Sequence, residues 1–421
     1  MHWPRGISAT LRLSEGDFTV DVIAEGTICS PQGFKAAGAH GGIKEGSTKL
    51  DVALVESDRG ASAAAVYTTN QVQAAPLYVC REYLQNGRAR AVVLNSGNAN
   101  ACTGEQGMDN ARAMSIQVAQ ALGVEHEDVL VCSTGVIGVQ LPMDKVEKGI
   151  AAALSVRAET GGYDAAVAIM TTDTVPKICA VEIGIDGNKV RIGGMAKGSG
   201  MIAPNMATML SVVTTDATVP PALLKELLST AVKRSFNCIT VDGDMSTNDT
   251  VIALANGAAG GAELQAGSAA TAVFSEALEA VCRELARKIA RDGEGATKLV
   301  SIEVRGGRSE DEARQVGLSV ANSNLVKTAV FGRDPNWGRI LCAMGYAGVE
   351  MDPQKVEVAL CGTPIYGAGS GLAFDHKALV EAMSAEDIPI VIDLAAGGER
   401  AEIFTCDLSY DYVRINAEYT T

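Results

Sequence analysis

The chain has 421 residues, of which 47% are hydrophobic and 20% are charged, and its formal net charge is −15 at pH 7. This composition is typical of a folded globular protein with enough apolar residues for two or three domains. The sequence has no cluster of Lys and Arg that could follow nucleic-acid phosphates, and no run of about 18 apolar residues that could span a bilayer. We therefore expect neither a nucleic-acid partner nor a membrane-spanning helix.

The cysteines and histidines restrict the chemistry further. None of the ten cysteines belongs to a Cys-x-x-Cys pair, which predicts buried free thiols in a reducing cytoplasm. The N-terminal "MHWPRGIS" has no basic start followed by an apolar stretch, so we expect no signal peptide and a cytoplasmic protein. The four histidines share no metal-ligand spacing. We therefore expect no metal site and a catalytic base other than imidazole.

In chain order, the first predicted elements are a strand at 89–97, a helix at 105–123 and a strand at 128–135. Apolar residues recur at helical spacing in the helix, and a glycine ends it. Residues 177–195 alternate in hydrophobicity on both sides of an Asp-Gly pair, which predicts a β-hairpin.

The second half predicts helices at 220–236 and 274–293, followed by strands at 298–307, 355–362, 388–394 and 401–415. Helices and strands alternate without a strict βαβ rhythm. This pattern favours an α/β fold with layered, mixed sheets over a doubly wound sheet. A turn-rich segment near residue 310 is a candidate sub-domain boundary.

The stretch "GGMAKGSGMIAPNMATMLSVVTTDA" at 193–217 has two unlike halves. Its first half is rich in glycine and contains Lys197, whereas the half from Ala207 is apolar and β-branched, like a buried strand. In a phosphate-binding loop the lysine directly follows a glycine, whereas Lys197 directly precedes Gly198. The spacing of such a loop is therefore absent. Thr208 lies at the join between the two halves.

Thr208 in this setting suggests an activated nucleophile. A threonine hydroxyl needs a neighbouring base, and the residue's own α-amine can serve once the preceding peptide bond is cut. The hydroxyl of Thr208 could make that cut itself by attacking the carbonyl carbon of Ala207. A loop that simply enters a strand is the plainer interpretation of the same residues.

Such a site also needs hydrogen-bond donors for the developing oxyanion. The segment "VCSTGVIG" ends a predicted strand at Thr134 and Gly135, where backbone N–H groups and a hydroxyl can project. The end of an ordinary strand is the plainer interpretation of the same residues, because strands often end in Ser-Thr-Gly.

Taken together, these stretches resemble the ornithine acetyltransferases (glutamate N-acetyltransferases) of arginine biosynthesis. The motifs that carry the resemblance occur in order along essentially the whole chain: "PQGFKAAGAHGGIK", "YTTNQVQAAP", "VLNSGNANACTG", "CSTGVIG", "IMTTDTVPK", "MAKGSGMIAPNMATML", "DGDMSTNDT", "RDGEGATK", "AVFGRDPNWGRI" and the terminal "RINAEYTT".

The resemblance implies a precursor that cuts itself between Ala207 and Thr208 into an α chain (1–207) and a β chain (208–421), with two of each in the mature enzyme. It assigns Thr208 as nucleophile and Thr134 with Gly135 as the oxyanion-hole pair. The substrate-binding positions that it implies are Thr171, Lys197, Thr208, Glu294, Asn416 and Thr421.

The implied reaction moves an acetyl group from N-acetylornithine to glutamate by double displacement, without a metal or an organic cofactor. Some members of the family also use acetyl-CoA as donor. The implied fold is of the type shared with the self-processing aminopeptidases. Two alternatives remain open from the sequence: an aminopeptidase-type hydrolase on the same scaffold, and a non-enzymatic acidic protein that binds metabolites or acts as a scaffold and stays intact.

Overall fold

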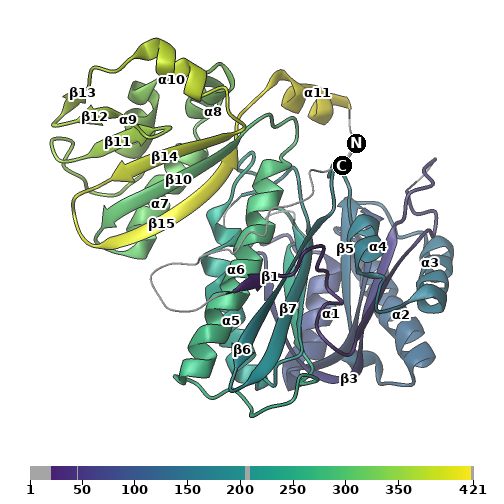
Figure 1. Cartoon of the computed structure of the whole chain (residues 1–421). Coiled ribbons are helices and arrows are strands. Elements are labelled where there is room, and N and C mark those ends of the chain that lie inside the picture. Colours follow the sequence, from purple (N-terminus) through teal and green to yellow (C-terminus); the bar gives the residue numbers. More distant parts are fainter. Residues whose placement is uncertain (1–19, 45, 204–208, 419–421) are drawn as a thin grey trace.

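The computed structural model describes residues 20–44, 46–203 and 209–418. Figure 1 shows a larger lobe and, at the upper left, a smaller one. The elements of the larger lobe are, in chain order, β1 (Asp21–Val22), β2 (Phe34–Ala39), β3 (Val52–Tyr67), α1 (Ala75–Tyr83), η1 (Leu84–Asn86), β4 (Arg88–Asn98), α2 (Gly104–Leu122), η2 (His126–Asp128), β5 (Val129–Val136), α3 (Met143–Val156), α4 (Gly162–Ala168), β6 (Lys177–Ile185), β7 (Asn188–Lys197), β8 (Leu210–Thr215), α5 (Pro221–Lys233), η3 (Phe236–Cys238), β9 (Thr250–Ala255) and α6 (Ala269–Arg291).

The strands of the larger lobe form one mixed sheet in the order β1-β6-β7-β8-β9-β3-β4-β5, and β2 also pairs with β3. The pairs β4/β5 and β8/β9 are parallel. The register of β3 against β4 shifts between Glu56 and Ala61, and residues Ser62 to Tyr67 of β3 pair with β9. Asn248, just before β9, donates to the carbonyls of Ala99 and Ser133, so the start of β9 meets the ends of β4 and β5.

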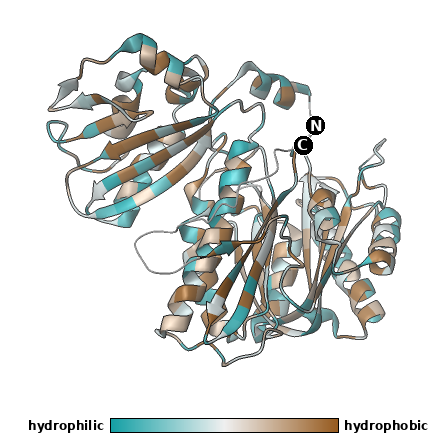
Figure 2. Cartoon of the chain, viewed as in Figure 1, coloured by the Kyte–Doolittle hydropathy of each residue, from teal (hydrophilic) through white to brown (hydrophobic). Residues whose placement is uncertain are grey.

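Both faces of this sheet are buried. In β9, Ile252 and Leu254 belong to a core shared with β4, β5 and helices α1 to α4, whereas Val251, Ala253 and Ala255 belong to a core shared with α5 and α6. Successive side chains of a strand point to opposite faces, so the two cores lie on opposite sides of β9. The strands are accordingly rich in hydrophobic residues, and brown segments recur along them in Figure 2.

The smaller lobe contains a sheet in the order β13-β12-β11-β14-β10-β15, in which only β10 and β14 are parallel. Helix α11 follows β15. The elements are β10 (Leu299–Gly307), α7 (Glu310–Ala321), α8 (Asn324–Phe331), α9 (Trp337–Gly345), β11 (Glu357–Leu360), β12 (Thr363–Gly367), β13 (Ser370–Gly371), α10 (His376–Ala382), β14 (Asp387–Asp393), β15 (Glu399–Cys406) and α11 (Tyr410–Glu418).

The layered, mixed-sheet α/β fold and most predicted elements are confirmed. The hairpin turns at residues 186 and 187, between β6 and β7. Helix α6 begins at Ala269, earlier than predicted, because the Ser268 hydroxyl caps it by accepting from the N–H of Thr271. The division of the chain near residue 310 stays a prediction. In the part of the chain that the structure covers, no helix is long and apolar enough to cross a membrane.

The strand predicted at 401–415 is wrong beyond Cys406, where β15 ends. The carboxylate of Asp407 accepts from the backbone of Thr297 and Lys298, and the hydroxyl of Ser409 accepts from the N–H of Asp411. These contacts turn the chain into α11, which has no buried residue. The apolar alternation in this segment therefore did not reflect a half-buried strand.

Candidate active site

The predicted site residues lie at the ends of strands, in the loops beside them and in α11. Thr134 and Gly135 are near the end of β5, and Lys197 is the last residue of β7. Thr171 lies before β6, Glu294 after α6, and Asn416 in α11. Three other predicted residues, Ala207, Thr208 and Thr421, lie outside the described residues.

Gly135 has a backbone that only glycine can adopt without strain. Its φ is +135°, and a Cβ atom there would lie 2.3 Å from the carbonyl carbon of Gly97 on the neighbouring strand. Thr134 is buried, and its backbone pairs with Ser96 and Asn98 of β4. The ladder thus holds the Thr134-Gly135 pair in place, as a preorganised donor pair requires.

Lys197 is 1% exposed, and its Nζ lies 3.9 Å from Oδ2 of Asp173. The same Oδ2 accepts from the N–H of Thr171 at 3.0 Å, and Oδ1 accepts from the N–H of Gly198 at 2.7 Å. Burial lowers the pKa of Lys197, and the charge of Asp173 opposes this shift. Asp173 therefore joins two predicted binding positions, Thr171 and Lys197.

Asp173 is part of a larger buried network. Lys177 donates from Nζ to Oδ1 of Asp173 and to Oδ2 of Asp292, each at 2.6 Å. Burial alone would raise the pKa of Asp173, but the ammonium groups of Lys177 and Lys197 hold that pKa well below its usual range. The backbone carbonyl of Asp292 accepts from the Ser199 hydroxyl at 2.5 Å. This network fixes three loops around the end of β7.

Glu294 brings a carboxylate to the same place. Its N–H donates to the carbonyl of Ser199 at 2.8 Å, and its Oε2 accepts from Nδ2 of Asn416 at 2.8 Å. A Cβ atom on Gly200 would lie 2.2 Å from this carboxyl group, so any larger residue there would displace the carboxylate from this position. A buried ammonium, Lys197, and a largely buried carboxylate thus lie at the two ends of the segment 198–200.

Sequence reasoning missed Asp173, Asp292, Asp249 and Lys44, although all four lie inside the quoted motifs. Asp249 is fully buried, and its Oδ1 accepts from the N–H of Met209 at 2.7 Å. Lys44 donates to the carbonyls of Met170 and Leu50, and burial lowers its pKa to about 8. The sequence feature that could have revealed these four residues is a charged side chain inside an otherwise apolar or glycine-rich motif.

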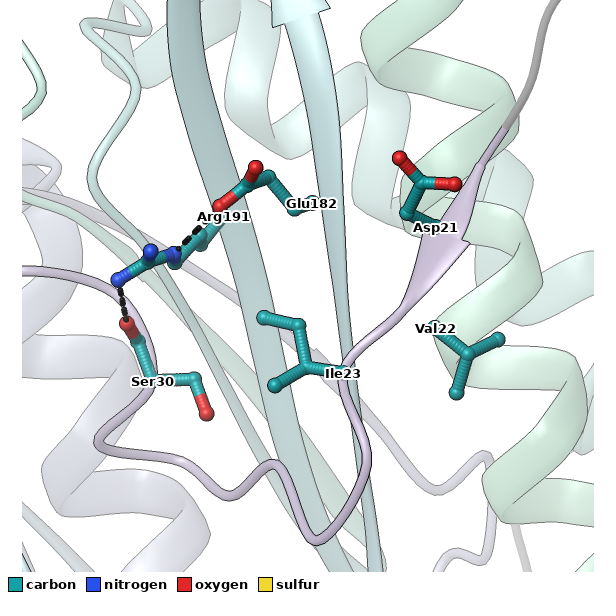
Figure 3. Close-up of a pocket in the computed structure, with 6 residues that line it drawn as sticks. All are labelled: Asp21, Val22, Ile23, Ser30, Glu182 and Arg191. Atoms are coloured by element: carbon teal, nitrogen blue, oxygen red, sulfur yellow. Dashed lines mark hydrogen bonds and ion pairs between the residues drawn. The ribbon is translucent and has the colours of Figure 1, made fainter. Parts of the chain in front are cut away.

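Two surface hollows contain none of the predicted site residues. One, of about 330 Å³, lies beside β1 and is lined by Asp21, Val22, Ile23, Ser30, Glu182 and Arg191. Figure 3 shows Arg191 held between Glu182 and the carbonyl of Ser30, so its charge is already paired. The other, of about 600 Å³, lies in the smaller lobe beside Trp337 and Tyr366.

Comparison with known proteins identifies the family. Residues 35–421 match the model of the ArgJ family. The chain belongs to the ArgJ family. The resemblance drawn from the motifs is thereby confirmed.

Two relatives that carry the name ArgJ cover nearly the whole chain, and a solved ArgJ structure covers half of it. The arginine biosynthesis bifunctional protein ArgJ of Caldanaerobacter subterraneus subsp. tengcongensis is 50% identical over 403 residues, which cover 95% of this chain and 100% of that relative. The protein of the same name from Symbiobacterium thermophilum is 53% identical over 397 residues, which cover 94% of this chain and 99% of that relative. A crystal structure of ArgJ from Bacillus halodurans is 42% identical, with a TM-score of 0.49, and covers 50% of this chain and 100% of that one.

Proposed function

We propose that the chain moves an acetyl group from N-acetylornithine to glutamate through an acetyl-Thr208 intermediate. The observation that carries this proposal is the pair of opposite charges, Lys197 and Glu294, held at the two ends of segment 198–200. Donor and acceptor both carry ammonium or carboxylate groups, which a buried cation and a buried carboxylate can bind at separate ends. Membership of the ArgJ family supports the same assignment.

In the proposed reaction, Thr208 attacks the acetyl carbonyl of N-acetylornithine, and Thr134 with Gly135 stabilises the oxyanion. Ornithine leaves, and the α-amine of glutamate then attacks acetyl-Thr208. Thr171, Asn416 and Thr421 complete the proposed substrate contacts. No metal or organic cofactor is needed, because the amide bond of the donor carries the acetyl group and the amine of Thr208 supplies the base.

The nucleophile gains its base, the α-amine of Thr208, when the chain cuts itself between Ala207 and Thr208. The mature enzyme would then contain two α chains (1–207) and two β chains (208–421). Support for the cut is chemical: the proposed base, the amine of Thr208, exists only after that bond is broken.

Steady-state kinetics with both substrates test the proposal. A single nucleophile can hold one acetyl group at a time, so double-reciprocal plots should give parallel lines, and acetylglutamate should form in step with ornithine. Release of free acetate with no acetylglutamate would identify a hydrolase. An uncut chain with neither activity would indicate a binding protein. Replacing N-acetylornithine with acetyl-CoA in the same assay determines whether the chain has a second donor.

A further inference from the structure

Self-cleavage needs a base that the mature enzyme does not. Before the bond between Ala207 and Thr208 is cut, the nitrogen of Thr208 is an amide and cannot accept a proton from its hydroxyl. A second group must therefore take that proton and pass it to the leaving nitrogen.

Asp249 is placed for this step by its contact with Met209. Its Oδ1 accepts from the Met209 N–H at 2.7 Å, and that nitrogen is bonded directly to the carbonyl carbon of Thr208. The carboxyl group is 0% exposed. Its second oxygen, Oδ2, has no hydrogen-bond partner among the described residues, which is unusual for a buried polar atom.

The strand pairing fixes this placement. Residue Leu210 of β8 pairs with Thr250 of β9 in a parallel register, so Met209 and Asp249 are the residues immediately before the two strands. The backbone carbonyl of Asp249 also accepts from the N–H of Thr68, at 3.0 Å. The backbone of Asp249 is therefore fixed by its neighbours, and this keeps the Asp249 carboxyl group beside the start of β8.

We propose that Asp249 is the proton carrier of self-cleavage, an inference that rests on the proposed function. Its carboxylate takes the proton of the Thr208 hydroxyl as the C–O bond to Ala207 forms. It returns that proton to the Thr208 nitrogen as the C–N bond breaks, which leaves an ester and a free amine. Water then cleaves the ester, giving the carboxylate of Ala207, the hydroxyl of Thr208 and one proton.

The charges around Asp249 predict how the cut depends on pH. Burial raises the pKa of Asp249 well above its usual value, while the hydrogen bond from the Met209 N–H and the ammonium of Lys197 act in the opposite direction. Only the ionised form can accept a proton. The cleavage rate of the wild-type chain should therefore rise with pH as Asp249 loses its proton.

The test follows cutting of the full chain after cell-free synthesis, by denaturing electrophoresis at several pH values. Asp249→Asn keeps an oxygen for the Met209 N–H but cannot carry the proton, and loss of a general base typically slows a step by about 10²–10⁴-fold. Asp216→Asn is the matched control. Asp216 follows the other end of β8, is also 0% exposed, and its oxygens accept from the N–H groups of Gln32 and Arg191.

We expect Asp249→Asn to stay largely uncut while Asp216→Asn cuts at close to the wild-type rate. Cutting of Asp249→Asn at the wild-type rate would overturn the inference and leave the proposed function intact. A wild-type cleavage rate that does not change with pH would also overturn the inference, and this measurement needs no variant. A wild-type chain that never cuts would instead refute the proposed nucleophile itself.

Discussion

Asp173→Asn tests the buried charge network that holds Lys197. The change removes the carboxylate that Lys177 contacts at 2.6 Å and Lys197 approaches at 3.9 Å. Removing one partner of a buried ion pair costs about 3–5 kcal/mol of the free energy of unfolding. Because Lys177 keeps its contact with Asp292 at 2.6 Å, we expect the lower end of that range, about 3 kcal/mol.

Urea unfolding followed by circular dichroism measures this cost. The folded-state pKa of Asp173 is depressed, so its stabilising contribution is complete above the unfolded-state pKa of about 3.9 and is lost as pH falls through the folded-state value. The difference between wild type and Asp173→Asn should therefore be constant from pH 7 to about 5 and shrink below about 4.

The matched control is Asp58→Asn, which breaks an exposed pair with Arg59. Exposed pairs contribute about 0–1 kcal/mol, so this variant should unfold almost like wild type. An Asp173→Asn variant no less stable than the control at pH 7 would refute the network argument. A difference that grows as pH falls would refute its electrostatic basis.

Three further changes test other parts of the site. Thr134→Ala should fold normally but lose about 10²–10³-fold in acetyl-transfer turnover, whereas Thr134→Ser should keep most of it; wild-type turnover in the alanine variant would make Thr134 a strand residue only. Lys44 has a lowered pKa, so the wild type should gain free energy of unfolding relative to Lys44→Met as pH rises from about 8 to 10.5, and a parallel pH dependence in both would contradict this. Thr208→Ala should remain one uncut, inactive chain on a denaturing gel, and a cut variant would assign the cleavage to another residue.

The fold was largely predictable because the larger elements carry periodic patterns. The sequence alone shows the helical spacing of apolar residues in α6 and the Asp-Gly turn of the hairpin β6–β7. The segment after Cys406 was misread because its strand-like alternation lies on a helix with no buried residue. Its direction is set by contacts of Asp407 and Ser409 with residues more than a hundred positions away, which no local pattern reveals.

The candidate site could be predicted only through the family motifs, and the roles of its residues stay predictions. Lys197 alone is a lysine among glycines, and Asn416 alone is a polar residue near a chain end. The structure adds contacts that the sequence does not show. Asp173 accepts hydrogen bonds from both Thr171 and Gly198, and Asn416 donates one to Glu294. Asp249 was missed because its significance lies in one hydrogen bond to Met209, forty positions earlier.

The most direct test of the account is mass spectrometry of the protein after it is mixed with N-acetylornithine and quenched in acid before glutamate is added. We predict two fragments, the second beginning at Thr208 and carrying one acetyl group that disappears when glutamate is supplied. An intact chain of 421 residues that still forms acetylglutamate, with no trapped acetyl group, would contradict the account.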